Sequence, residues 1–195
     1  VAADDLPQAW EAVVDRLLES EHFGERWARH WLDVARYADS NGLDENIAYG
    51  NAWRYRDWVV SSFNADLPYD RFVIEQLAGD LLGRDKAGPE KDRLLIATGF
   101  LSLGTKSLAE SDLEKLAMDI IDEQINTFGS AFMGLTLECA SCHDHRYDPI
   151  SQKEYYQLFA YFNNGDESNI SVSRSEKEHG TWIKTKASHD ARMKE

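Results

Sequence analysis

Both cysteines of the chain lie in one short stretch, Cys139-Ala140-Ser141-Cys142-His143, and these residue types at this spacing can carry out chemistry. Two thiols separated by two residues and followed by an imidazole form the C-x-x-C-H arrangement that attaches haem covalently. Each thiol would bond one vinyl group of the porphyrin, and the ring of His143 would bind the iron. The motif therefore predicts a haem c held by Cys139, Cys142 and His143.

Three alternatives use the same residues without haem. The cysteines could be buried or disulfide-bonded side chains beside an unrelated histidine. Cys139, Cys142, His143 and His145 could instead hold a tetrahedral zinc, but structural zinc sites usually take their second ligand pair from a distant segment, and we find no such pair. A thiol redox couple is disfavoured, because the C-x-x-C redox motif belongs with a βαβ pattern that this sequence lacks.

The second axial ligand of the iron is an open question. His30 is the first candidate, because it shares an expected helical face with Trp27 and Trp31, as an imidazole entering an apolar haem pocket would. The alternative for His30 is a core histidine bonded to a carboxylate. Met118 and Met133 are further candidates through their sulfur atoms, although methionines more often fill the core.

The residues that follow the motif should surround the cofactor. Arg146 is the natural partner of a propionate by its charge, and His145 would belong to the pocket wall. Asp144 or Asp148 could orient an imidazole N–H of the two histidines. A polar turn before Pro149 is the alternative. If the second iron position were open, His145 or His30 with Arg146 could support peroxide chemistry, which would make the chain an enzyme.

The chain is strongly acidic, with a formal net charge of -14. Residues 174–195 carry six basic and four acidic side chains, so residues 1–173 hold a net charge of -16. Such a surface repels nucleic acid and anionic lipid and favours cationic partners, including basic patches on other proteins. We therefore expect no nucleic-acid binding. If the chain carries haem, we expect it to exchange electrons with a redox partner protein or with adjacent domains of the same polypeptide.

The sequence has no apolar run of about 18 residues, which predicts no membrane span. Its first residues, from Val1 to Asp5, lack the basic start and apolar stretch of a signal peptide. Covalent haem attachment normally takes place outside the cytoplasmic membrane. If haem is attached, we expect a periplasmic or otherwise exported protein whose leader was removed or lies upstream.

Apolar residues recur mostly at three- and four-residue steps, which predicts a mainly α, compact multi-helix domain. In the first helix, which we expect to reach about Ser20, one apolar stripe contains Trp10, Val13, Val14, Leu17 and Leu18. Further helices are expected over residues 24–39, 52–64, 69–82 and 90–98, followed by a loop over 99–105. Capping boxes at Ser111 with Glu114 and at Ser151 with Glu154 precede two more helices, to about Leu137 and over 155–162. We expect a helical cytochrome-type domain over 1–166 and a polar, extended or mobile C-terminal segment over 167–195.

The loop from Asp39 to Asn46 is rich in carboxylate and amide oxygens and contains Gly42 for a bend. It could wrap a calcium ion, although it lacks the full pattern of about twelve residues of an EF-hand loop. The alternative is a plain loop after a helix, in which Asn and Gly satisfy the backbone.

Four segments, residues 24–40, 55–59, 72–80 and 139–150, resemble the planctomycete-type cytochrome c domain family, which carries a C-x-x-C-H-D-H motif. The similarity extends over about residues 10–166. It implies an exported, haem-bearing module of large multidomain proteins, often accompanied by a further cytochrome-like domain and by carbohydrate-binding modules. Electron transfer through one covalent haem is therefore the expected function, with a peroxidase and a haem-free or zinc-stabilised structural module as alternatives. Contact with carbohydrate would come through domains outside this chain.

Overall fold

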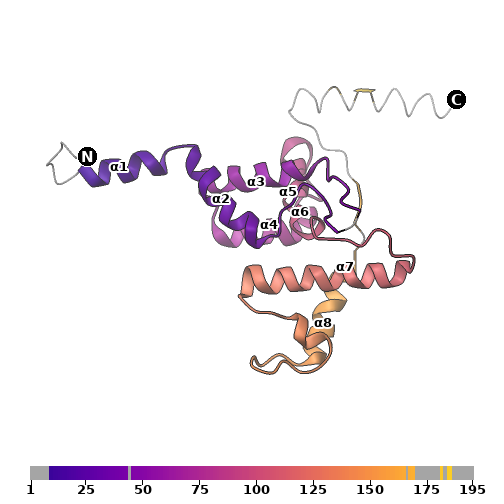
Figure 1. Ribbon diagram of the computed structural model, residues 1–195. Helices are drawn as coiled ribbons and strands as arrows, with labels where there is room; N and C mark the ends of the chain where they lie inside the picture. The colour runs from indigo at the N-terminus through magenta and orange to yellow at the C-terminus, as the bar shows by residue number, and fades with distance from the viewer. Residues whose placement is uncertain (1–8, 44, 166, 170–180, 182–183, 186–195) are drawn as a thin grey trace.

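The computed structural model describes residues 9–43, 45–165, 167–169, 181 and 184–185, and within them it is mainly helical, which confirms the predicted fold class (Figure 1). The described part has no β-strand, and its strand-like pairing is a single bridge between Ser40 and Ala48. The helices are α1 (Ala9–Leu18), α2 (His22–Val34), α3 (Ala52–Asn64), α4 (Tyr69–Leu82), α5 (Gly88–Ala97), α6 (Gly99–Ser102), α7 (Leu113–Phe128), η1 (Gly129–Met133), η2 (Glu138–Ser141) and α8 (Gln152–Phe162). Most of the expected C-terminal segment lies outside the described residues, so its character stays a prediction.

Helices α2 to α6 form the larger body around one core. Aromatic rings dominate this core, including Tyr55 and Trp58 of α3, Phe72 of α4 and Phe100 of α6. Helix α2 lies against α3 through its small residues, because a Cβ at Gly24 would come within 2.5 Å of the backbone oxygen of Val60. The close approach of these two helices therefore depends on residues without large side chains.

A second, smaller core joins α7, η2 and α8. It contains Ile121 and Ile125 of α7, Leu137, Ala140 of η2 and Tyr155 of α8. In Figure 1, α7 crosses beneath the larger body, and α8 with the preceding loop hangs below α7. The C-x-x-C-H stretch therefore belongs to the smaller unit.

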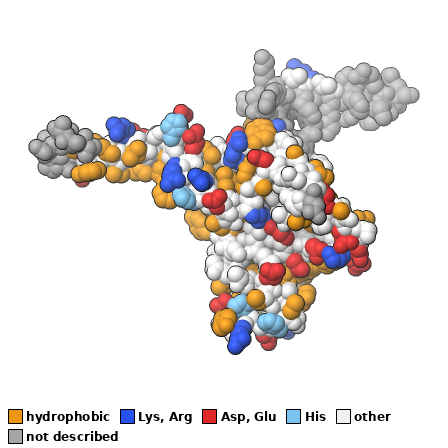
Figure 2. Space-filling view, in the orientation of Figure 1, with side chains coloured by type: hydrophobic (Ala, Val, Ile, Leu, Met, Phe, Trp, Pro, Cys, Tyr) orange, Lys and Arg blue, Asp and Glu red, His pale blue; other side chains and the backbone are white. Residues whose placement is uncertain are grey.

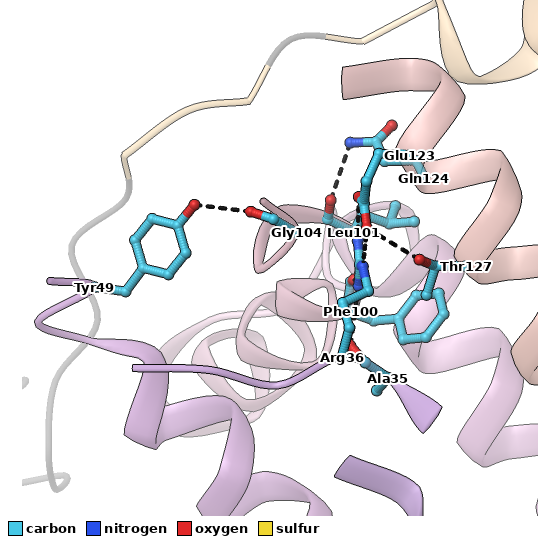
Figure 3. Close-up of polar contacts among 9 residues, drawn as sticks. All are labelled: Ala35, Arg36, Tyr49, Phe100, Leu101, Gly104, Glu123, Gln124 and Thr127. Atoms are coloured by element: carbon cyan, nitrogen blue, oxygen red, sulfur yellow. Dashed lines mark hydrogen bonds and ion pairs between the residues drawn. The ribbon is translucent and has the colours of Figure 1, made fainter. Parts of the chain in front are cut away.

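A polar network connects the end of α2 with α7 (Figure 3). The guanidinium of Arg36 donates to both carboxylate oxygens of Glu123 and to the backbone oxygen of Phe100. Thr127 donates to the same carboxylate at 3.0 Å. A Cβ at Gly104 would lie 2.1 Å from Oε2 of Glu123, so any other residue at position 104 would displace this carboxylate.

Two predicted helices, α3 and α4, have the expected bounds, and two others end differently. Helix α2 stops at Val34 and not at Asp39, because Arg36 adopts a left-handed backbone with φ 48°, which a right-handed helix cannot contain. Helix α7 continues as the π-helix η1 and then stops, since Gly134 has φ 66° and cannot continue a right-handed helix. The expected extension to Leu137 was therefore wrong.

Smaller corrections concern a cap and a loop. The first residue before α7 is Asp112, whose side chain accepts from the amides of Glu114 and Lys115, so the capping box expected at Ser111 does not form. Residues 99–102 of the expected loop form the short helix α6. The capping box of Ser151 and Glu154 is confirmed at the start of α8.

Helix α1 projects from the body as an arm and has no buried residue (Figure 1). Its apolar stripe is exposed, with Trp10 at 69% and Leu17 at 58% of full exposure. The periodicity correctly predicts the helix but not whether its apolar face is covered. Within the described residues, no helix combines the length and the hydropathy needed to cross a membrane.

Candidate functional site

The two cysteines lie on and just after the 3-10 helix η2, and both are exposed free thiols. Ala140 between them has no exposed surface and belongs to the smaller core. Its amide donates to the backbone oxygen of Leu137 at 2.9 Å. The alanine side chain belongs to the core, and both neighbouring cysteines of the turn, Cys139 and Cys142, are exposed.

The N-terminal half of α8 holds the motif in place. The backbone oxygen of Ser141 accepts from Nε2 of Gln152 and from the hydroxyl of Tyr156, each at 3.0 Å. The carboxylate of Asp144 accepts from the backbone amide of Gln152 at 2.8 Å. Gln152 and Tyr156 were missed at the sequence level, because bonds to a backbone oxygen leave no signature in side-chain spacing.

The start of α8 is itself fixed by its capping box. The hydroxyl of Ser151 accepts from the amide of Glu154, and the carboxylate of Glu154 accepts from the amide of Ser151 at 2.8 Å. This hydrogen bond from Ser151 lowers the pKa of Glu154 below its ordinary value. The cap, the helix and the cysteine loop thus form one continuous set of hydrogen bonds.

His143 is exposed, and its Nδ1 lies 2.7 Å from the backbone oxygen of Asp144. A carbonyl oxygen only accepts, so Nδ1 carries the hydrogen in this bond. The neutral ring then has its free lone pair on Nε2, which is the atom that a metal would bind. A backbone carbonyl that fixes the tautomer of a histidine is a common second partner of metal-binding rings.

His145 has a different role in the same loop. Its side chain is only 5% exposed, and its Nδ1 accepts from the amide of Asp148 at 2.9 Å and from that of Tyr147 at 3.3 Å. Nε2 therefore carries the hydrogen of the neutral ring, so neither nitrogen offers a lone pair. His145 closes the turn before Pro149, which agrees with the alternative of a polar turn for this residue.

Arg146 is exposed on the same turn. Its guanidinium lies over the ring of Tyr147, with Cζ 5.7 Å from the ring centroid. Within the part of the chain that the structure describes, no carboxylate forms an ion pair with it. Its position and free charge suit a contact with an anionic group of a cofactor beside the loop.

His30 is not brought together with His143. Figure 2 shows the described histidines in two separate groups, one over α2 and the other at the end of the molecule that carries η2 and α8. His30 is exposed on α2 and lies beside Trp27, with ring centroids 5.4 Å apart. The fully buried residues of α2 are the small Gly24 and Ala28, and Trp31 of the expected face packs against the core beside Phe72. Of the alternative sulfur ligands, Met133 is half exposed on η1 and Met118 is partly buried on α7.

The loop considered for calcium uses several of its polar groups to close itself. Oδ1 of Asn41 accepts from the amide of Ile47 at 2.6 Å, and Nδ2 donates to the backbone oxygen of Lys106. The hydroxyl of Ser40 donates to Asn46 at 2.7 Å. Asp44 lies outside the described residues. Among those described, no three His, Cys, Asp or Glu side chains are grouped as ligands for one ion. Calcium binding by this loop stays a prediction.

An acidic hollow of about 490 Å³ lies next to the cysteine loop. Glu138, the residue before Cys139, lines it together with Asp119, Asp122 and Glu123 of α7 and with Arg36, which pairs with Glu123. Figure 2 shows acidic side chains along this side of α7. The thiols therefore lie at the edge of a negatively charged surface.

Comparison with curated proteins and with solved structures gave no match. A family model described as "PSCyt2: Protein of unknown function (DUF1549)" matches residues 1–167. The matched range includes all four segments of the sequence resemblance. The chain therefore belongs to the PSCyt2 (DUF1549) family.

Proposed function

We propose that the chain is a c-type cytochrome domain that holds one covalent haem through Cys139 and Cys142 and transfers electrons. The observation that carries the proposal is the exposed C-x-x-C-H turn, with two free thiols and a histidine whose Nε2 is available. When bound, haem supplies a one-electron couple at its iron. The residues fit this group by type, order and accessibility.

The chain's own residues would hold and orient the group. His143 would offer Nε2 to the iron while the backbone oxygen of Asp144 keeps its ring in place. Ala140 and the bonds from Gln152 and Tyr156 to Ser141 would keep the two thiols in a fixed relation. Arg146 would pair with a propionate.

The partner follows from the charge of the surface. The acidic hollow beside Glu138 and the net charge of -14 favour a redox partner that presents a basic patch. Such a partner could be a separate protein or an adjacent domain of the same polypeptide. Because haem is attached outside the cytoplasmic membrane, we also propose a periplasmic or otherwise exported location.

The test is production in a bacterial periplasm that carries the haem-attachment machinery, followed by intact-mass analysis and peroxidase staining after denaturing electrophoresis. We expect the mass of one haem added to the polypeptide. Replacing both thiols, as Cys139→Ser with Cys142→Ser, should remove it, whereas Ser141→Ala in the same loop should keep it. A bare polypeptide mass for the unaltered chain would contradict the proposal.

The reduced optical spectrum then separates electron transfer from catalysis. A six-coordinate, low-spin spectrum is expected for an electron carrier. A high-spin spectrum with peroxide turnover would support the peroxidase alternative instead.

A further inference from the structure

A second cavity, remote from the cysteine loop, has a charge opposite to that of the whole chain. It has a volume of about 870 Å³ and lies between the start of α3, the junction of α5 with α6, and residues 167–169. Among the described residues that line it, the charged side chains are Arg54, Lys106 and Glu167. Their sum is one positive charge, in a protein whose net charge is -14.

Arg54 has no carboxylate partner among the described residues. Its Nε is 3.5 Å from Oδ1 of Asn51, and its guanidinium lies over the ring of Trp53, with Cζ 4.8 Å from the centroid. The ring holds the guanidinium by a cation–π contact, which leaves its N–H donors for another acceptor. A partly buried arginine without an anion is a recognition group for carboxylates or phosphates.

Lys106 is held differently. Its side chain is only 12% exposed, and its ammonium forms an ion pair with Glu167. Glu167 therefore occupies the place that an incoming anion would take. An anion that binds in this cavity must compete with Glu167 for Lys106 or share it.

The remaining walls combine apolar side chains, among them Tyr55, Leu95, Ile96 and Leu103, with polar residues that include Asn51, Thr98 and Ser102. The volume lies within the range of about 300–1,000 Å³ for ligand sites, so the cavity has room for a small organic molecule. The apolar part of the ligand would lie against the apolar side chains. Its charged end would meet Arg54.

We propose that this cavity binds a small organic monoanion, a carboxylate with an apolar ring or chain, through Arg54 and Lys106. A carboxylate matches the fork of the guanidinium in shape. One negative charge balances the single net positive charge of the lining, whereas a phosphate dianion would leave an excess. The site is independent of the haem proposal, since it uses none of the residues of the cysteine loop.

The test is isothermal titration of the full chain with 2-naphthoate, with naphthalene as the uncharged control and 2-naphthyl phosphate as the dianion. We expect one site for 2-naphthoate and weaker binding of both comparison compounds. Arg54→Gln should weaken 2-naphthoate binding about tenfold or more, as expected for a lost charge-assisted hydrogen bond. Arg84→Gln, at an exposed arginine outside the lining, is the matched control and should leave the affinity unchanged.

Glu167→Gln gives the sharpest signature, because it removes the competing carboxylate and should tighten binding several-fold. A nonspecific apolar site would show no response to this substitution. Thermal unfolding of each variant checks that the fold is kept. Absence of binding to the unaltered chain, or an equal loss in Arg54→Gln and Arg84→Gln, would overturn the proposal.

Discussion

Arg36 at the end of α2 and Glu123 on α7 form a two-pronged ion pair between residues 87 positions apart in the sequence. Nη2 of Arg36 donates to Oε2 of Glu123 at 2.7 Å, and Nε of Arg36 donates to Oε1 (Figure 3). Both side chains are about four-fifths buried, at 19% and 22% exposure. The pair connects the larger body to the unit that carries the cysteines.

Loss of this ion pair should destabilise the contact between the larger body and α7. Arg36→Ala leaves the Glu123 carboxylate partly buried and unpaired, so we expect a loss of about 2–3 kcal/mol in the free energy of unfolding. Arg36→Lys keeps the charge but not the fork and should cost less, about 1–2 kcal/mol. Urea denaturation measures both. Equal stability of Arg36→Lys and the unaltered chain would show that the fork geometry has no role.

Two leucines test the exposed arm. Leu17 on α1 is 58% exposed and Leu94 on α5 is 2% exposed. Leu17→Glu should change the free energy of unfolding by no more than about 0.5 kcal/mol. Leu94→Ala should cost about 2–5 kcal/mol, because it leaves a cavity in the core. A large loss on changing Leu17 in the isolated chain would mean that another surface covers α1 in solution.

The cap of α8 should make the smaller unit sensitive to acid. The folded-state pKa of Glu154 lies below its ordinary value of 4.5, so its stabilising effect is present above that value and disappears as the pH falls through the lower folded pKa. Circular dichroism of thermal unfolding between pH 6 and 3 would follow this change. Glu154→Gln keeps a capping side chain that does not titrate. The melting temperature of this variant should therefore decrease less between pH 6 and 3.

Ser151→Ala removes the hydroxyl that accepts from the amide of Glu154. We expect a cost of about 1 kcal/mol at neutral pH, the usual value for loss of an N-cap. The same variant should weaken the hydrogen bonds that Gln152 and Tyr156 of α8 donate to the backbone oxygen of Ser141. Faster alkylation or faster amide exchange in residues 138–144 would report that effect, and unchanged rates would argue against it.

The two histidines of the loop should respond differently to substitution. His143→Ala removes the ring whose Nε2 is available, so it should abolish the low-spin spectrum of attached haem. His145→Ala removes an acceptor for the amides of Tyr147 and Asp148, so it should lower thermal stability and leave the iron ligand in place. A reversed pattern in the optical spectra would assign the iron to His145.

For His30, the structure changes the expectation made from the sequence alone. Because His30 lies on α2, away from the cysteine loop, we expect His30→Ala to leave the spectrum of the haem-bound protein unchanged. Conversion to a high-spin spectrum would show that haem binding brings α2 and η2 together. His22→Ala, at an exposed histidine of the same helix, is the matched control.

The sequence predicts local features well. Helices α3 and α4 have the expected bounds, because Asp66-Leu67-Pro68 and Gly83 interrupt the helical pattern at their ends. The C-x-x-C-H motif is equally local, since its chemistry depends on neighbouring residues. Short spacing was not always sufficient, since the capping box expected at Ser111 and Glu114 does not form.

Long-range packing was not readable in the same way. The face of α2 with Trp27 and His30 seemed the buried one, because large apolar rings are usually inside. The structure packs α2 on α3 through Gly24 and Ala28, since only small residues allow the backbones to approach so closely. The pair of Arg36 and Glu123 gave no signal either, because it joins segments without a common period.

The division into two cores has a consequence for the order of assembly. Most of the large aromatic side chains that hold the molecule together lie in the body formed by α2 to α6, whereas the thiols extend from the smaller core of α7, η2 and α8. A newly made chain can therefore complete its bigger half while Cys139 and Cys142 remain within reach of a maturation enzyme. If haem is attached as we propose, its attachment would not require the core of the larger body to open.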